Sequence, residues 1–368
     1  MHWFTPLEAG AFMMSFRYSS GLIVGKFSPL HLGHEQLINQ AIAQCETVYL
    51  ISYSKPEFSK CEREQRERWL NLRFPEVRSV VLDDSNLSDF VNSEDWPCLP
   101  SNCASAEVHR KLCAELCLMH FQTAVDAVFS SEEYGAGFAL YLSEAFSEYY
   151  HREIKVVNVC EDPERLLLPI SGTEIRSDPH GNRQYLSGEV YRDFVDKVCF
   201  LGGESTGKSQ LSRLAAQLFE TEFVAEYGRA LWDAQGGVLH EPDMLKIAQV
   251  QVQQEEQACL MANRYLFCDT SPLTTLFYSH EMFGEVDPAL EDLAKRTYEY
   301  VFLCEPDFDF VQDGTRRDDA FRRLQHAWYL RELKLREIPF IRLYGTIDNR
   351  LRDIESVLCD AVFVDADT

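Results

Sequence analysis

Residues 21–34 read GLIVGKFSPLHLGH, and this stretch decides the fold of the first half of the chain. The apolar run 21–24 predicts a buried strand, which a glycine and a proline end before a helix starts. His31 and His34 flank Gly33 at the start of that helix, where unpaired backbone N–H groups and the helix dipole favour phosphate oxygens. Histidine side chains can donate to the same oxygens, so the sequence predicts a nucleotide-phosphate site here.

A second motif, ISGTEIR at residues 170–176, supports this interpretation, because its Ser and Thr can cap a helix and Arg176 offers a planar fork to phosphate. The two patterns, G-x-F-x-P-x-H-x-G-H and I-S-x-T-x-x-R, resemble the nucleotidyltransferase superfamily that transfers AMP or CMP onto a phosphate. The resemblance implies that His31 and His34 are catalytic at the α-phosphate of ATP, while Lys26 and Arg176 hold the outer phosphates. The ATP-binding residues expected in this half are Gly25, Lys26, Phe27, Gly33, Ser171, Thr173 and Arg176.

Class I aminoacyl-tRNA synthetases share the H-x-G-H pattern, but they pair it with a Lys-Met-Ser-Lys-Ser type loop and need a basic surface for tRNA. This sequence has neither, so small-molecule adenylyltransferases remain the expectation.

The second half carries its own phosphate motif, GGESTGKS at residues 202–209, between an apolar strand at 197–201 and an amphipathic segment at 208–219. Lys208 is expected to reach the β- and γ-phosphates of ATP. We expect Ser209 and Asp269, which ends the apolar run 265–268, to bind Mg²⁺, and Lys208 and Asp269 to be catalytic. The ATP-binding residues expected here are Gly202, Gly203, Glu204, Ser205, Thr206, Gly207, Ser209, Arg316 and Arg317.

Two further clusters surround this motif. The basic run DGTRR at 313–317, followed by Arg322 and Arg323, suits a lid that closes on transferring phosphates; the alternative is a helix start with scattered salt bridges. The run EYGR at 226–229 follows an expected strand at 222–225 and could line an acceptor pocket, although Tyr227 could equally be packed in the core.

Short apolar runs alternate with helical patterns along the whole chain, which predicts parallel sheets covered by helices. The expected strands are 21–24, 47–51, 78–82, 127–129 and 155–159, then 197–201, 222–225, 265–268, 300–304 and 340–343. The expected helices include 104–122, 183–195, 208–219, 243–263, 272–282, 320–337 and 347–358. We therefore predict an α/β protein with a Rossmann-like nucleotidyltransferase domain at 16–192 and a P-loop kinase domain at 193–368.

Composition sets the class of protein. The 368 residues include 35 Lys and Arg against 59 Asp and Glu, a formal net charge of −24 that disfavours nucleic acid as the main partner. No apolar run approaches the ~20 residues of a membrane span, and 12 scattered cysteines without a signal peptide predict a cytoplasmic protein. A zinc site among Cys98, Cys103, Cys113 and Cys117 is the less favoured alternative to simple packing.

The combination of both motif sets resembles the NadR-type family of bifunctional nicotinamide mononucleotide (NMN) adenylyltransferases and ribosylnicotinamide kinases. The resemblance implies that the second half phosphorylates nicotinamide riboside to NMN and that the first half adenylylates NMN to NAD, with Mg²⁺ and ATP. Longer family members carry an N-terminal helix-turn-helix; only ~15 residues precede the first expected strand here, too few for such a motif, so we do not expect DNA binding. The acceptor-binding residues expected from the pattern and the resemblance are Trp96, Glu226, Tyr227, Arg229 and Asp313.

Four questions stay open at this point. Trp96 could stack on the nicotinamide ring or pin a loop onto the core. The chain could be a nucleotide-sensing regulator with vestigial turnover, or an adenylyltransferase for another phosphate fused to a kinase for its precursor. A homo-oligomer is also possible from the sequence.

Overall fold

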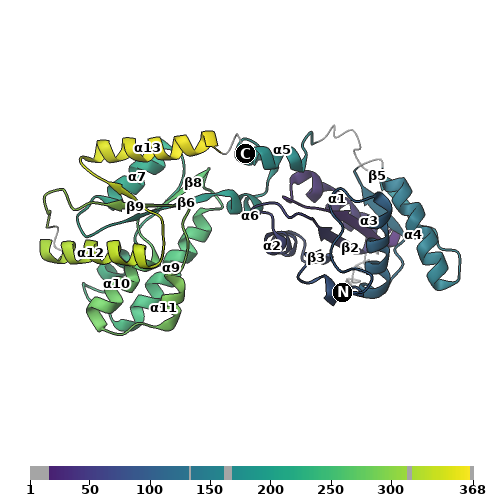
Figure 1. The fold of residues 1–368 in the computed structure, drawn as a ribbon, viewed down its shortest axis with the longest axis horizontal. Coiled ribbons are helices and arrows are strands. Elements are labelled where there is room, and N and C mark those ends of the chain that lie inside the picture. Colours follow the sequence, from purple (N-terminus) through teal and green to yellow (C-terminus); the bar gives the residue numbers. More distant parts are fainter. Residues whose placement is uncertain (1–15, 132–133, 161–167, 313–316, 365–368) are drawn as a thin grey trace, which may run out of the picture. The chain divides into compact units, whose positions relative to one another are not determined.

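The computed structural model describes residues 16–131, 134–160, 168–312 and 317–364, and the chain forms two compact units, Met1–Val190 and Tyr191–Thr368. Each unit is an α/β fold built on its own parallel sheet, so the predicted fold class is confirmed (Figure 1). The boundary between the units lies two residues before the one expected from the sequence. That each unit is a separate enzyme stays a prediction.

The first unit contains a five-stranded sheet in the order β3-β2-β1-β4-β5, and every strand pair is parallel. Its strands are β1 (Tyr18–Gly25), β2 (Cys45–Tyr53), β3 (Arg78–Leu82), β4 (Ala127–Ser130) and β5 (Val157–Cys160). Its helices are α1 (Leu32–Gln44), α2 (Arg63–Arg73), α3 (Ala106–Glu115), α4 (Gly135–Tyr150) and α5 (Gly172–Ser177), and α6 (Gly188–Tyr191) lies at the unit boundary.

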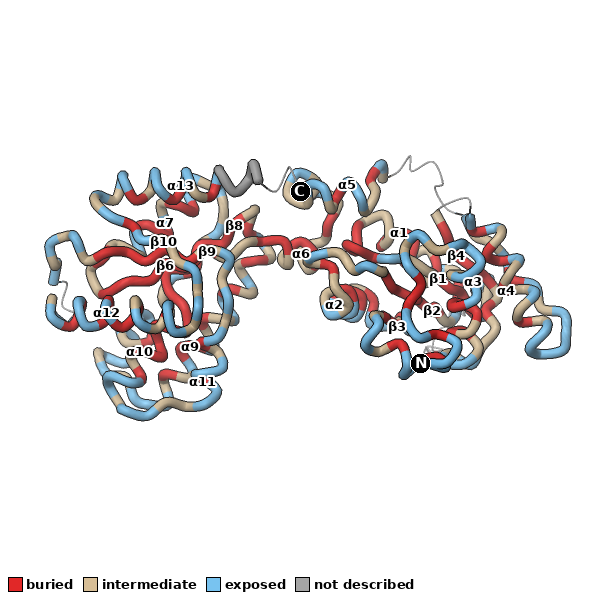
Figure 2. The backbone as a smooth tube through the Cα atoms, in the orientation of Figure 1, coloured by how far each residue is buried: buried red, intermediate tan, exposed pale blue. Residues whose placement is uncertain are grey.

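The central position of β1 explains why its C-terminal end carries a site. Leu22 and Ile23 are almost completely buried, and because successive side chains of a strand point to opposite faces, β1 is covered on both sides. Figure 2 colours the middle of β1 as buried. One edge of β1 pairs with β2 and the other pairs with β4. Next to β4, the Ser20 N–H donates to Asp126 over 2.9 Å. Helices α3 and α4 cover one face through Leu112, Phe138 and other core residues. The turn after β1 therefore leaves the sheet at a switch point between neighbouring strands, the usual place for ligands in such folds.

The second unit repeats the design with a parallel five-stranded sheet in the order β10-β9-β6-β8-β7. Its strands are β6 (Asp196–Leu201), β7 (Phe223–Val224), β8 (Tyr265–Cys268), β9 (Tyr300–Cys304) and β10 (Ile341–Leu343). Its helices are α7 (Lys208–Leu218), α8 (Tyr227–Ala234), α9 (Glu241–Ala258), α10 (Pro272–Phe283), α11 (Pro288–Leu293), α12 (Asp319–Leu335) and α13 (Ile347–Val364). Helices α7 and α13 pack on one face of this sheet, and α9, α10 and α12 pack on the other (Figure 1).

Two expected helices differ in the structure. The segment 183–195 is not one helix: it contains 3-10 turns at Arg183–Tyr185 and Arg192–Phe194 on either side of the single turn α6. The segment 104–122 begins as α3 but continues as a wider π-helical turn at Leu116–His120. Cys113 and Cys117 are buried in the core of the first unit, which agrees with packing. Within the described part of the chain, none of the helices is both long and apolar enough to span a bilayer.

Candidate active sites

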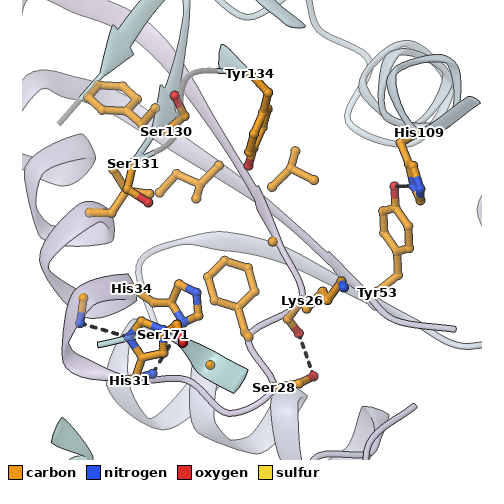
Figure 3. Close-up of a pocket in the computed structure, with 18 of the residues that line it drawn as sticks. Lys26, Ser28, His31, His34, Tyr53, His109, Ser130, Ser131, Tyr134 and Ser171 are labelled. Atoms are coloured by element: carbon orange, nitrogen blue, oxygen red, sulfur yellow. Dashed lines mark hydrogen bonds between the residues drawn. The ribbon is translucent and has the colours of Figure 1, made fainter. Parts of the chain in front are cut away.

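The first phosphate loop connects β1 to α1, and its two histidines form the cap of that helix. His31 is the N-cap: its Nδ1 accepts the Gly33 N–H over 3.2 Å, and the His31 N–H points to Nδ1 of His34 over 3.5 Å. The two rings stack with their centroids 3.7 Å apart (Figure 3). Because Nδ1 accepts in both residues, the ring proton lies on Nε2, the nitrogen needed to donate to a phosphate oxygen.

Small and rigid neighbours fix this loop. A Cβ on Gly33 would lie 3.1 Å from the His31 ring, so a side chain at residue 33 would crowd the imidazole. Phe27 is buried, has a φ of 49°, and packs edge-on against His34 with centroids 4.8 Å apart. The carbonyl of Lys26 accepts hydrogen bonds from the hydroxyls of Ser28 and Ser52 at 3.1 and 3.2 Å. The loop is therefore held in shape before any nucleotide binds.

The second motif forms the short helix α5 and brings a cation to the same place. Ser171 and Glu174 cap α5 reciprocally: the Ser171 hydroxyl accepts the Glu174 N–H over 3.2 Å, and the Ser171 N–H donates to the Glu174 carboxylate over 2.8 Å. Arg176 donates to the Ser28 carbonyl at 2.5 Å and to the Thr173 hydroxyl at 2.9 Å. Thus a residue 148 positions away along the chain contacts the first loop.

The catalytic and ATP-binding residues expected in the first unit all line one cavity of about 610 Å³. They are Gly25, Lys26, Phe27, His31, Gly33, His34, Ser171, Thr173 and Arg176. Trp96 is not among the residues lining this cavity: its ring is buried in the core of the first unit and its Nε1–H donates to Glu115 over 2.5 Å. The structure therefore favours the alternative in which Trp96 pins its loop.

The other end of this cavity contains residues that sequence reasoning missed. The Tyr53 hydroxyl and Nδ1 of His109 lie 2.8 Å apart, and Asn102, Arg110 and Tyr134 line the same region (Figure 3). Burial raises the pKa of Tyr53, so the phenol stays protonated; burial and the charge of Lys26 lower the pKa of His109. The Tyr53 hydroxyl and the His109 ring thus offer polar groups to a second ligand in a part of the cavity that also contains the Arg110 cation.

The second phosphate loop lies between β6 and α7 and uses glycines where side chains would collide. Gly207 has a φ of 83°, and a Cβ on Gly202, whose φ is 146°, would lie 2.7 Å from the Cys304 carbonyl. The Lys208 ammonium donates to the carbonyls of Gly202 and Gly203 at 2.9 and 3.0 Å. Buried Arg350 donates to the Thr206 carbonyl at 2.9 Å and so stabilises the loop from the protein interior.

Asp269 provides the carboxylate at the end of β8. It is only 3% exposed, and its Oδ1 has no hydrogen-bond partner among the described residues. Burial, followed by the charge of Glu226, raises its pKa to about 7, although Lys208 and a hydrogen bond from Ser209 act in the other direction. A buried carboxylate with one oxygen unbonded, beside the Ser209 hydroxyl, fits Mg²⁺, which prefers oxygen ligands and would supply positive charge next to Asp269.

The second unit has its own cavity of about 700 Å³ next to this loop. The expected site residues that line it are Glu204, Ser205, Thr206, Gly207, Lys208, Ser209, Glu226, Arg229 and Arg317. Tyr227 instead packs against the core, and its N–H donates to Gln251 over 3.0 Å. Asp313 and Arg316 lie outside the described residues.

Arg322 and Arg323, two of the four arginines in the expected lid cluster, have structural partners. Arg322 is buried and donates to the Phe308 carbonyl at 2.9 Å, and it also contacts Asp319. Arg323 pairs with Asp319 over 2.8 Å. For these two residues the structure favours the helix-start alternative over a lid.

The cavity of the second unit also contains unexpected residues. Thr274, Thr275 and Tyr278 on α10, Trp232 on α8 and Gln325 on α12 line it. The first three share one side of α10 at helical spacing, directly after Asp269, which is the signal that could have revealed them.

Comparisons with known proteins find relatives of the second unit and of most of the chain. Residues 197–350 match a family model described as an AAA domain. Two curated relatives, the trifunctional NAD biosynthesis/regulator proteins NadR of Escherichia coli (strain K12) and Salmonella typhimurium (strain LT2), are each 29% identical over 316 residues, which cover 80% of this chain and 71% of each relative.

Two solved structures align with nearly the whole chain. The crystal structure of NadR protein in complex with NAD and AMP-PNP matches with a TM-score of 0.64 at 19% identity, covering 92% of this chain and 95% of that one. NadR protein in complex with NR also matches with a TM-score of 0.64, at 20% identity, covering 91% and 94%. The chain is thus similar in sequence to the NadR proteins over four-fifths of its length and has the fold of the NadR crystal structures.

Proposed function

We propose that this chain makes NAD in two steps. The second unit phosphorylates nicotinamide riboside to NMN with ATP, and the first unit transfers AMP from a second ATP to NMN. The observation that carries the proposal is that each unit has one cavity lined by phosphate-loop residues together with residues distant in the chain, Arg176 in the first unit and Glu226, Arg229 and Arg317 in the second. The names of the relatives, and the NAD and NR in the matching NadR crystal structures, support the choice of substrates.

In the first unit, an oxygen of the NMN phosphate attacks the α-phosphorus of ATP and pyrophosphate leaves with the electrons of the broken P–O bond. No covalent enzyme intermediate is needed. The Nε2–H groups of His31 and His34 donate to the α-phosphate as charge builds on it, and Lys26 and Arg176 hold the outer phosphates. The hydrogen bonds that fix these groups in advance reduce the cost of reorganisation during the reaction.

In the second unit, the 5′-hydroxyl of the riboside attacks the γ-phosphorus of ATP and ADP leaves. Lys208, which lines the cavity, holds the β- and γ-phosphates of ATP, and Asp269 at the end of β8 accepts the hydroxyl proton or holds the metal. Ser209 and Asp269 are the residues that would hold Mg²⁺, which neutralises phosphate charge when bound. The raised pKa of Asp269 suits a group that takes up a proton near neutral pH.

The location, ligands and metal of the protein belong to the same proposal. We place the reaction in the cytoplasm, with ATP, nicotinamide riboside, NMN and NAD as ligands and Mg²⁺ as the metal. The acidic chain, with its formal net charge of −24, is poorly suited to binding DNA.

The test is a coupled synthesis assay with nicotinamide riboside, ATP and Mg²⁺. We expect ADP and NMN first, then NAD and pyrophosphate. A double variant, His34→Ala with Lys208→Ala, is the matched control and should produce neither product. Turnover with phosphopantetheine or a sugar phosphate in place of NMN, without turnover of NMN, would replace this proposal by the alternative acceptor.

A further inference from the structure

The cavity of the second unit contains two carboxylates that phosphate binding does not explain. Glu204 and Glu226 both line it, although a carboxylate repels the phosphates of ATP. The cations that line the same cavity are Lys208, Arg213, Arg229 and Arg317. These cations can serve the phosphates, so the carboxylates are available for the other ligand.

Hydrogen bonds fix the position of Glu204. Its Oε1 accepts the Tyr278 hydroxyl over 3.0 Å and its Oε2 accepts the Arg317 N–H over 2.9 Å. Its own N–H donates to buried Gln325 over 3.0 Å. Burial, followed by the charges of Glu226 and Glu204, keeps the pKa of Tyr278 well above its ordinary value, so the phenol remains a neutral donor. These hydrogen bonds hold the carboxylate at a fixed place in the cavity.

Glu226 comes two residues after β7, the edge strand that lies beside β8 in the sheet. Strand β7 pairs in parallel with β8 through Val224 and Cys268, so Glu226 and Thr270, each two residues further along, follow their strands at the same edge of the sheet. Its charge is one of the causes of the raised pKa of Asp269, after burial. Among the described residues, Glu226 has no salt-bridge partner within 4.0 Å.

A second observation indicates that the cavity receives a polar ligand next to these carboxylates. The side chain of Thr270 lines the cavity and is only 4% exposed, yet its hydroxyl has no partner among the described residues. A buried hydroxyl without a partner costs free energy unless a ligand supplies one. A sugar hydroxyl bound at this point would satisfy it.

We propose that Glu204 and Glu226 form a negatively charged wall that selects an acceptor nucleoside whose base carries a positive charge. This inference rests on the proposed kinase function, because the pyridinium ring of nicotinamide riboside carries such a charge. Two unit charges a few ångströms apart in a partly desolvated cavity attract strongly enough that losing one carboxylate should cost about tenfold in discrimination.

The experiment compares two ribosides of nearly the same shape: nicotinamide riboside, which is cationic, and its reduced dihydro form, which is neutral. The wild type should have the higher kcat/KM for the cation. Glu204→Gln and Glu226→Gln should each lower the ratio of the two kcat/KM values about tenfold, while Glu226→Asp keeps most of it. Exposed Glu222, just before β7, is the matched control: Glu222→Gln should keep the parental ratio. Because the ratio is internal to each preparation, partial unfolding of a variant does not change it.

The outcomes distinguish a failure of the charge inference from a failure of the proposed kinase function. Equal losses on both ribosides in Glu204→Gln and Glu226→Gln would show that the side chains bind hydroxyls or shape the loop, and would overturn the charge inference alone. A wild type that phosphorylates neither riboside would overturn the proposed function and this inference with it.

Discussion

At the scale of single residues, His34 gives the sharpest test of the first site. Its Nδ1 faces the His31 N–H, so its Nε2–H is the group that can donate to the α-phosphate. His34→Ala should lower the conversion of NMN to NAD by about 10²- to 10³-fold, because one donor to the transition state is lost. Phosphorylation of the riboside by the same preparation should stay at the parental rate. A variant that makes NAD from NMN as fast as the parent would rule out this role for His34.

Asp269 leads to a prediction about stability. Its pKa is about 7 in the folded protein against an ordinary value of 3.8, so the folded state binds this proton more tightly than the unfolded chain does. The contribution of Asp269 to stability is therefore fully present below about pH 4 and is lost as the pH rises through about 7. A residue placed for function in this way costs the fold stability at neutral pH.

Asp269→Asn removes this titration while keeping the shape of the side chain. At pH 8, without metal or nucleotide, the variant should be more stable than the parent by up to roughly 4 kcal/mol, and the difference should disappear near pH 4. Denaturant unfolding of both proteins at the two pH values measures it. A stability difference that does not change with pH would contradict the raised pKa.

At the scale of elements, the loop between β6 and α7 makes one prediction of its own. Lys208→Ala removes the cation that the loop holds over its own carbonyls, so riboside phosphorylation should fall to background. The conversion of NMN to NAD should continue, and added NMN should bypass the defect in the coupled assay. Loss of both activities in a folded variant would show that the two sites are not independent.

The sequence predicts the central elements well because their signals are local. Strands such as β8 and β9 are continuous apolar runs, and each phosphate loop follows its strand directly. The expectation of one helix over 183–195 is wrong, because the apolar residues Val190, Tyr191 and Phe194 have helical spacing yet are buried from two separate short turns. Periodicity reports which residues are buried, and a chain of turns can bury the same set.

Local sequence patterns also predict only part of each site. Residues of a motif, such as His31 and Lys208, can be found from spacing alone. Tyr53 and His109 could not, because they come from the end of β2 and from α3 and meet only through the tertiary fold. Trp96 shows the reverse case, since its position in the sequence suited a ligand but its ring is buried in the core.

At the scale of the whole molecule, the two units should work apart. Cutting between Val190 and Tyr191 keeps Arg192 with its partner Glu256 in the second unit. We expect residues 16–190 to adenylylate NMN and residues 191–368 to phosphorylate the riboside, because each fragment keeps its own sheet and core, with enough residues to fold alone. Separate expression and assay of the two fragments tests this. Folded fragments that are inactive alone but active after mixing would indicate a shared active site.

The central strand of each sheet is also the first strand of its unit to be made. Strand β1 pairs with β4, and β6 pairs with β9, across about 100 residues of chain. At ~5–20 residues per second, a ribosome needs roughly 5–20 seconds to deliver the missing neighbour. During that time an apolar strand emerges with an open edge, which is the kind of surface that aggregates. We therefore expect each half of the nascent chain to depend on chaperones until its last strands have left the exit tunnel.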